Sequence, residues 1–332
     1  MFGITLQPSG ERYLASASDT ILQALEQGGL EFPAFCRHGH CGLCRAELLA
    51  GMCAPVVDAP PAQGLIGPGE ILICARRPVA DLVLRLDWGP GRAPAIPARV
   101  VGITRLSREI YRLELRLPIV QPFTFAPGQF VLLRLKSLVR AYALANAPHE
   151  RNPELHVHTS PGGQLETALA GLEVGHLVTI EGPFGQFYYR PETGVHECRI
   201  LLLAQGTGYA PMRSILRHLS ETLGGSFSGR VELVWEAPAV EALYDEILLR
   251  RLEAEWEWFQ YHPVVRDPDR ARAPPSPEDP LTPARVAGAI CYLAGPGVWV
   301  SAAHARLRAL GVPEKAIYRE PFGPDVRSAS VP

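Results

Sequence analysis

The sequence predicts a multidomain chain in which an α+β module, an antiparallel β-barrel and a doubly wound α/β domain follow one another. Residues 1–90 contain short strands around a single helix, residues 97–192 contain a run of short strands, and residues 196–325 alternate buried strands with helices. The chain of 332 residues is also too long for one compact core. We therefore expect three domains with these bounds.

Composition and charge narrow the possible functions. The chain is 47% hydrophobic and 20% charged with a net charge of −2, which is typical of a globular protein and gives little support to nucleic-acid binding. Its first residues lack the basic start and apolar run of a secretory signal, and no stretch approaches the roughly 20 apolar residues of a membrane span. Seven cysteines, an odd number, fit a reducing compartment better than a disulfide framework. We expect a cytoplasmic protein without a membrane span.

The stretch "CRHGHCGLC" at residues 36–44 crowds together residue types that bind metals. Its three cysteines have the spacing C-x4-C-x2-C, and a fourth cysteine follows far downstream in "ILICARRP". This is the plant-type [2Fe–2S] pattern, in which a tight loop supplies three thiolates and a distant residue supplies the fourth. The sequence therefore predicts a cluster with four cysteine ligands: Cys36, Cys41, Cys44 and Cys74.

A zinc site with His38 and His40 as ligands is the alternative interpretation of this stretch. Structural zinc sites usually have two closely spaced ligand pairs, and this chain has one. Gly39 and Gly42 suit the cluster, because glycines let a loop turn tightly and aim N–H groups at the sulfides. Four nearby arginines would raise the cluster potential and would suit an acidic partner: Arg37, Arg45, Arg76 and Arg77.

Local signals predict the elements of the first two domains. "SDTILQALEQGG" predicts a helix with Ser18 or Asp19 as its N-cap and Gly28-Gly29 at its end. "WGPGRAPAIPA" then has the composition of a linker. The predicted barrel strands are "ARVVGITRL", "YRLELRL", "QFVLLRL", "ELHVHTS" and "LVTIEG".

The third domain shows a change of period. Its predicted strands are "RILLLA", "VELVW", "AICYLAG" and "AIYREPF". Its predicted helices are "PMRSILRHLSETL", "EALYDEILLRRLEAEW" and "VWVSAAHARLRAL". Residues 262–283 are rich in proline and predict a surface excursion inside this domain.

In this order the three parts resemble the ferredoxin–NAD(P)H reductase superfamily, and within it the reductase components of bacterial multicomponent oxygenases. The resemblance covers nearly the full length of the chain. It implies a β-grasp-like [2Fe–2S] ferredoxin domain, an antiparallel Greek-key flavin barrel and a NAD-binding domain with a doubly wound parallel sheet.

The stretch "RAYALAN" is similar to the flavin motif of this family, R-x-Y-S/T-x-x-N. An arginine offers a forked donor to the flavin phosphates, and a tyrosine offers a flat face to the isoalloxazine ring. "SPGGQLETAL" follows at the distance found in the family, and its glycines can bring N–H groups onto a phosphate. The resemblance implies FAD, chosen over FMN by family habit, with these contacts: Arg140, Tyr142, Ala143, Asn146, His156, Gly162, Gly163 and Gln164.

The stretch "LLLAQGTGYAPMRSIL" predicts a strand, a glycine turn and a helix, which is typical of a pyrophosphate site. "CYLAGPG" and "YREPF" resemble the closing segment of the same family. Glu236 and Pro238 stand where the family often carries an arginine, so a 2′-phosphate would meet a carboxylate and NADH is favoured over NADPH. The implied contacts are Gly206, Thr207, Gly208, Pro211, Gly295, Pro296 and Phe322.

The chain departs from the family pattern at four positions. Ala143 replaces a hydroxyl residue that bonds the flavin edge, and Glu166 stands where a hydroxyl is expected near the phosphates. Gln205 replaces the first glycine of the dinucleotide turn, and Ala294 replaces a cysteine near the nicotinamide. These departures leave three outcomes open: slow hydride transfer, an altered nicotinamide pose or a different electron donor.

The resemblance implies that electrons pass from NADH through FAD to the cluster and then to a separate protein, since a flavin accepts hydride yet releases electrons singly. Tyr142, Glu320 and Phe322 are the residues expected at the hydride-transfer pocket. The expected partner is a terminal oxygenase or another electron-accepting enzyme with an acidic docking face. The alternative is an electron-carrying or partner-binding subunit of the same fold that has lost efficient NADH oxidation.

Overall fold

A computed structural model of the chain describes residues 1–30, 37, 39, 42–56, 66–86, 95–120, 123–135, 138–159, 164–191, 199–222, 227, 229–266 and 281–322; for residues 164–166 it describes the backbone alone. The chain divides into two compact units, Met1–Ala95 with Glu181–Gln186 and Ile96–Ile180 with Phe187–Pro332. The expected bounds 1–90, 97–192 and 196–325 stay predictions. None of the helices among the described residues is long and apolar enough to cross a membrane.

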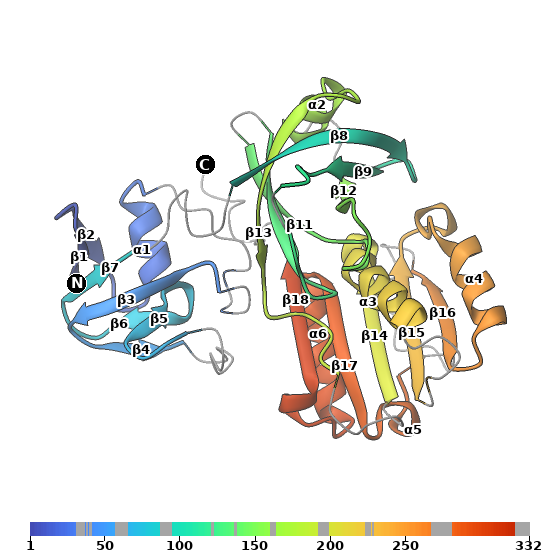
Figure 1. The fold of residues 1–332 in the computed structure, drawn as a ribbon. Coiled ribbons are helices and arrows are strands. Elements are labelled where there is room, and N and C mark those ends of the chain that lie inside the picture. Colours follow the sequence, from blue (N-terminus) through green and yellow to red (C-terminus); the bar gives the residue numbers. More distant parts are fainter. Residues whose placement is uncertain are drawn as a thin grey trace. The chain divides into compact units, whose positions relative to one another are not determined.

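The N-terminal module is a mixed five-stranded sheet packed against one helix (Figure 1). The sheet has the order β2-β1-β7-β3-β5, with β1 and β7 parallel at its centre, as in a β-grasp fold. Helix α1 places Ile21, Leu22 and Leu25 in the core beneath the sheet. The elements are β1 Phe2–Gln7, β2 Arg12–Ala15, α1 Ile21–Gln27, β3 Arg45–Ala50, β4 Cys53–Pro55, β5 Glu70–Leu72, η1 Ile73–Ala75, β6 Arg76–Pro78 and β7 Leu82–Arg85.

The N-cap of α1 is Thr20, so the expectation of Ser18 or Asp19 was wrong. The Thr20 hydroxyl accepts a hydrogen bond from the Gln23 N–H, and the Gln23 side chain accepts one from the Thr20 N–H, which makes a capping box. The Asp19 carboxylate accepts instead from the Ser16 N–H in the preceding turn. The helix ends at Gly28, as expected.

The second element group is a six-stranded antiparallel barrel with the sheet order β11-β10-β13-β8-β9-β12. An antiparallel bridge between Leu144 and Leu155 links the two edge strands and nearly closes the barrel. Alternate residues such as Val100, Leu113 and Val131 fill its interior. The elements are β8 Ala95–Arg105, β9 Ile110–Arg116, β10 Phe130–Leu135, β11 Leu138–Ala143, β12 Glu154–His158, α2 Gln164–Ala170 and β13 Leu177–Phe184.

The C-terminal part is a doubly wound α/β fold in the same compact unit as the barrel (Figure 1). Its five strands are parallel in the order β16-β15-β14-β17-β18. Leu202 of β14 joins the core with α3 and α4, whereas its neighbour Leu203 joins the core with α5 and α6, so helices cover both faces. The elements are β14 Arg199–Gln205, η2 Gly206–Gly208, α3 Tyr209–Thr222, β15 Arg230–Ala237, η4 Val240–Ala242, α4 Glu246–Glu255, β16 Phe259–Val265, α5 Pro283–Val286, β17 Ala289–Pro296, α6 Gly297–Ala309, η6 Glu314–Ala316 and β18 Ile317–Phe322.

Strand β16 corrects one expectation, because its residues His262–Val265 had been assigned to the proline-rich excursion. Pro263 lacks an N–H, but β16 is an edge strand, where one side of the strand has no ladder to complete. Most of the remaining excursion, residues 267–280, lies outside the described residues.

Candidate functional site

Two of the four predicted cluster ligands form a buried thiol pair. The Sγ atoms of Cys44 and Cys74 lie 3.0 Å apart, well beyond the roughly 2.05 Å of a disulfide, so the two cysteines are not joined to each other. Cys44 precedes β3 and Cys74 lies in η1 after β5, and these two strands are antiparallel neighbours. The Ile73 N–H donates to the Cys44 carbonyl at 3.0 Å and fixes the two segments together. The pair fits two ligands of a [2Fe–2S] cluster.

The rest of the predicted cluster loop is described only in part. Cys36, Cys41, His38 and His40 lie outside the described residues. Gly39 and Gly42 have φ values of 78° and 74°, and Arg37 has φ 54°, so the loop uses left-handed backbone as its glycines predict. These turns suit a chain that wraps around a compact group, as the cluster hypothesis requires.

Strand β11 carries the predicted flavin residues on one face. Arg140 and Tyr142 are two residues apart and therefore point to the same side of the strand. Arg140 is exposed and donates to the Val139 carbonyl at 2.9 Å, while Tyr142 packs partly on the barrel core, where burial raises the pKa of its hydroxyl. Ala143 ends the strand opposite Phe130. Gly162 and Gly163 lie outside the described residues, and Gln164 begins α2.

Asn146 and His156, predicted to contact the flavin, have their polar atoms engaged elsewhere. The Asn146 amide donates to the Ala147 carbonyl at 3.2 Å and accepts from the Glu154 N–H at 2.9 Å. Both ring nitrogens of His156 are bonded, Nδ1 to the Tyr244 hydroxyl at 2.9 Å and Nε2 to Glu154 at 3.0 Å. Their flavin contacts stay predictions, and their observed roles are structural.

The glycine turn after β14 packs closely against β17. Gly206 has φ 57°, and a Cβ on Gly208 would lie 2.0 Å from the Ala294 carbonyl oxygen of β17. Because β14 and β17 are adjacent while their helices α3 and α6 cover opposite faces, a crevice is expected at the carboxyl ends of these two strands. The structure brings these predicted dinucleotide residues to that edge: Gly206, Thr207, Gly208, Pro211, Gly295 and Pro296.

A carboxylate stands at the end of β15, where a ribose is expected to bind. Glu236 accepts a hydrogen bond from the Gln205 amide at 2.6 Å, and its other oxygen lies 3.0 Å from Nε of Arg266. Gln205, the departure from the family glycine, thus orients this carboxylate. A Cβ on Gly295 would lie 3.2 Å from the Gln205 Cβ, so the larger residue is accommodated by a glycine opposite it.

Strand β18 brings the last two predicted residues to the same edge. Glu320 pairs in register with Ala294, and Phe322 pairs with Pro296. Glu320 is 4% exposed, and Phe322 packs partly on the core beneath α3. Their roles in hydride transfer stay predictions.

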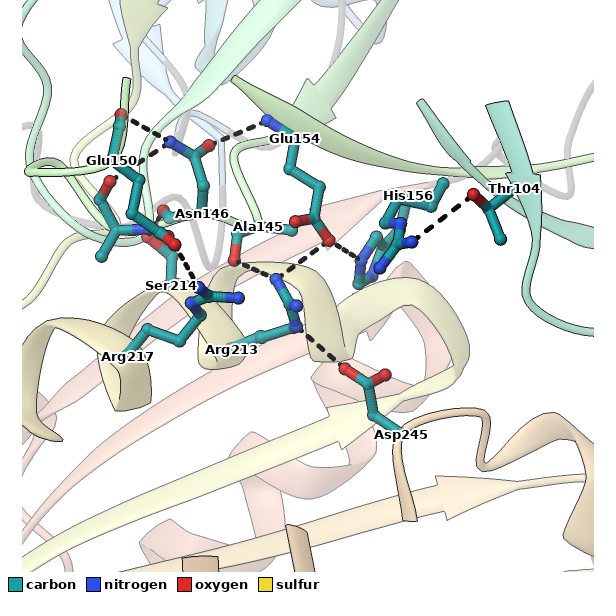
Figure 2. A network of polar contacts seen from close by, with 12 residues as sticks. Thr104, Ala145, Asn146, Glu150, Glu154, His156, Arg213, Ser214, Arg217 and Asp245 are labelled. Carbon is teal, nitrogen blue, oxygen red and sulfur yellow. Dashed lines mark hydrogen bonds and ion pairs between the residues drawn. The ribbon is translucent and has the colours of Figure 1, made fainter. Parts of the chain in front are cut away.

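A buried polar network that no sequence motif predicted connects the barrel to the dinucleotide domain (Figure 2). Arg213 of α3 has a side chain that is 6% exposed. Its guanidinium lies 2.9 Å from Glu154 of β12 and 2.9 Å from Asp245, and it donates to the Ala145 carbonyl at 3.0 Å. Two sequence features could have indicated this network. One is an arginine inside the apolar run "YAPMRSIL", and the other is a Glu-x-His pair in a strand whose alternate residues are apolar.

The ionisation of this network follows from its contacts. Burial alone would raise the pKa of Glu154, but the hydrogen bond from His156 and the charge of Arg213 together lower it to about 2. Burial lowers the pKa of His156, which therefore stays neutral. An ionised Glu154 carboxylate can only accept a hydrogen bond, so Nε2 of His156 carries the proton. Nδ1 of His156 is then an acceptor, and the Tyr244 hydroxyl donates to it.

Comparisons with known proteins agree with this architecture. Residues 4–79 match the 2Fe-2S iron-sulfur cluster binding domain, and residues 97–189 match the oxidoreductase FAD-binding domain. The chain is 30% identical to the terephthalate 1,2-dioxygenase reductase component 2 of Comamonas sp, over 80% of this chain and 79% of that protein. It is also 30% identical to the aromatic O-demethylase reductase subunit of Amycolatopsis sp., over 95% and 97% of the two chains.

A solved structure extends the likeness to the whole fold. The Amycolatopsis cytochrome P450 reductase superposes with a TM-score of 0.62 and 27% identity, over 98% of this chain and 99% of its own. Together with the thiol pair, the barrel and the dinucleotide turn, these matches identify an oxidoreductase that uses NAD(P)H, FAD and a [2Fe–2S] cluster. The chain belongs to the ferredoxin–NAD(P)H reductase superfamily, as a reductase with ferredoxin, FAD-binding and NAD(P)H-binding parts in one polypeptide.

Proposed function

We propose that the chain oxidises NADH, in preference to NADPH, and delivers the electrons to a separate terminal oxygenase or similar enzyme. NADH would supply a hydride and leave as NAD⁺, and FAD, when bound, would supply the chemistry that converts a two-electron hydride into single electrons for a [2Fe–2S] cluster. The residues proposed to hold these groups are Arg140 and Tyr142 for FAD, and Cys36, Cys41, Cys44 and Cys74 for the iron.

The Glu236 carboxylate is the observation that supports NADH. It is the last residue but one of β15, and Gln205 and Arg266 hold its two oxygens. A carboxylate here accepts hydrogen bonds from ribose hydroxyls and repels a 2′-phosphate. Arg266 would attract a phosphate, but its charge is already paired with Glu236.

Substitution of this carboxylate tests the proposal. The variant Glu236→Gln removes the negative charge and frees Arg266, so the ratio of kcat/KM for NADH to that for NADPH should fall by about 10-fold or more. Glu241→Gln, an exposed carboxylate in η4 on the following connection, is the matched control and should leave the ratio unchanged. An unchanged ratio in Glu236→Gln would place nucleotide selection elsewhere.

We further propose that Arg76 and Arg77 add positive potential beside the cluster site that attracts an acidic docking surface on the acceptor. Of the four arginines near the cysteines, Arg37 pairs with Glu26 at 2.8 Å and Arg45 lies 3.9 Å from Glu70. Arg76 and Arg77 follow the ligand segment directly in β6, and within the described residues they form no ion pair. Their reversal to glutamate should slow electron delivery to the acceptor at low salt by roughly 10-fold and leave reduction by NADH unchanged.

We place this work in the cytoplasm, where cysteines stay reduced. Among the described residues, no disulfide joins the cysteines Cys44, Cys53, Cys74 and Cys291. Reduced thiols are also what a [2Fe–2S] cluster requires as ligands.

The alternative function is an electron-carrying subunit that no longer oxidises NADH efficiently. Ala143 and Ala294 favour it, because both lack the polar groups that the family pattern places at the hydride-transfer pocket. Ala294 is fully buried in β17, with its carbonyl oxygen against Gly208. Turnover with NADH separates the two functions.

A further inference from the structure

The Arg213 network is built from contacts that cross between the barrel and the dinucleotide domain. A buried guanidinium is unfavourable unless its charge is compensated, and here Glu154 belongs to the barrel while Asp245 belongs to the dinucleotide domain. Separation of the two domains would leave buried charges without partners. The network therefore favours one arrangement of the domains over others.

Further bonds cross the same boundary. The Ser214 hydroxyl of α3 donates to the Asn146 carbonyl at 2.6 Å, and the Tyr244 hydroxyl donates to Nδ1 of His156 at 2.9 Å. Burial raises the pKa of the Tyr244 hydroxyl well above its usual value, so it remains a protonated donor. Figure 2 shows that the barrel segment whose carbonyls accept the bonds from Arg213 and Ser214 lies directly over α3.

The barrel end of the network continues the flavin strand. β11 ends at Ala143, and the carbonyls of Ala145 and Asn146, two and three residues later, accept the bonds from Arg213 and Ser214. The backbone that carries Arg140 and Tyr142 is thus anchored to α3 within a few residues.

The other end of the network reaches the dinucleotide turn. Helix α3 begins at Tyr209, immediately after Gly206–Gly208. Tyr209 stacks on Trp235 with ring centroids 4.0 Å apart, and Trp235 Nε1–H donates to the Gly206 carbonyl at 3.0 Å. Tyr244 packs edge-on against the same Trp235 ring at 4.9 Å. A continuous set of buried contacts therefore joins the flavin strand to the turn that is expected to hold the pyrophosphate.

We propose that Tyr244 and Arg213 are positioning residues for hydride transfer, because their contacts hold the dinucleotide turn in register with the flavin strand. The inference rests on the proposed oxidation of NADH. Hydride transfer is steeply sensitive to position, and a misplacement of 1 Å can cost roughly 100-fold in rate. The binding groups for each cofactor are expected within one domain or the other, so loss of register should lower the rate at saturation and leave affinity nearly unchanged.

A matched pair of tyrosines tests the proposal in the full-length holoprotein. Tyr244→Phe removes a hydroxyl that crosses the boundary, whereas Tyr209→Phe removes one that bonds Asp245 within the dinucleotide domain at 3.1 Å. With excess NADH under anaerobic conditions, Tyr244→Phe should reduce its flavin at least about 10-fold more slowly, with the Kd for NADH and the FAD content of wild type. Tyr209→Phe should stay within about threefold of wild type.

Hydrogen exchange gives a readout that does not depend on turnover. Amides of residues 144–158 in the barrel should exchange faster in Tyr244→Phe and at the wild-type rate in Tyr209→Phe, since only the former loses a bond to the barrel. If NADH fails to reduce even the wild type, the proposed function fails, and this comparison still tests the contact. Equal effects of the two variants, or a raised Kd for NADH with an unchanged maximal rate, would overturn the proposal.

The arginine provides a second matched pair. Arg213→Met keeps apolar bulk but removes the buried charge that crosses the boundary. Arg250→Met is the control, because Arg250 of α4 is exposed and its ion pairs with Glu246 and Glu253 stay within its own helix. The rate of flavin reduction should fall about 10- to 100-fold in the first and less than threefold in the second. Where Arg213→Met fails to fold, the tyrosine pair decides.

Discussion

Strands β11 and β12 are neighbours at the seam of the barrel, yet their polar residues have different uses. On β11, Arg140 is exposed, and within the described residues the Tyr142 hydroxyl forms no hydrogen bond. On β12, Glu154 and His156 are 7% and 4% exposed and each is bonded to side chains of its own and the adjoining domain. The comparison separates polar groups that are available to a ligand from polar groups that hold two domains together.

The difference has a physical origin in solvation. An exposed polar side chain without a protein partner costs little free energy, because water forms its hydrogen bonds until a ligand binds. A buried one must be bonded in the folded protein, so its partners are fixed by the fold. β11 should therefore govern FAD binding, and β12 should govern stability and the alignment of the domains.

The largest effect should come from the buried carboxylate of β12. Glu154→Ala leaves the Arg213 charge without its barrel partner, and the free energy of unfolding should fall by about 3–5 kcal/mol. A control lies at the other end of β12, where His158 pairs with Glu109, the residue before β9, and the side chains of Glu109 and His158 are 41% and 48% exposed. Glu109→Ala should cost less than about 1 kcal/mol in chemical denaturation, and equal losses would break the comparison.

The next effect should come from β11 and should act on ligand binding instead. Arg140→Ala should weaken FAD binding by roughly 10- to 100-fold, because a charge-assisted contact to phosphate is lost, and the stability of the FAD-free protein should not change. Arg116→Ala, an exposed arginine on β9, serves as the control. Full FAD retention in Arg140→Ala, measured by the ratio of flavin to protein after dialysis, would remove Arg140 from the site.

The smallest effect should be a pH dependence. The pKa of Glu154 is about 2 in the folded chain against 4.5 ordinarily, so its contribution to stability is complete above pH 4.5 and is lost as the pH falls towards 2. Glu154→Gln should flatten the fall of stability across this window. The pKa of Glu232 is also lowered, mainly by His262, whose Nε2 lies 3.3 Å from the carboxylate, so part of the fall should persist in the variant. An unchanged slope would mean that Glu154 is not ionised through this network.

Sequence patterns predicted the order of elements well because period and turn residues are local properties. The helix "PMRSILRHLSETL" and the strand "RILLLA" appear where expected, and the thiol spacing placed Cys44 and Cys74 together. Edge strand β16 was missed because proline is a valid signal against a strand except at a sheet edge. That exception depends on strand order, which is not a local property.

The network between the barrel and the dinucleotide domain could not be predicted from local sequence patterns, because it also depends on how distant segments pack. Arg213, Glu154 and Tyr244 are far apart in the sequence, and none of them belongs to a motif of fixed spacing. His156 was expected at the flavin because of its strand, whereas its bonds to Glu154 and Tyr244 are fixed only once the barrel and the parallel sheet pack. A charged residue within an apolar helical run was the one local sign of a buried ion pair.

The most direct test of the central claim is to mix the purified wild-type protein anaerobically with NADH and to follow its visible spectrum. We predict that the flavin and iron–sulfur bands both lose intensity with NADH. With the same amount of NADPH, the bands should lose intensity much more slowly. If both cofactors are present and dithionite bleaches them while NADH does not, the chain is not an NADH oxidoreductase, and the alternative of an electron-carrying subunit holds.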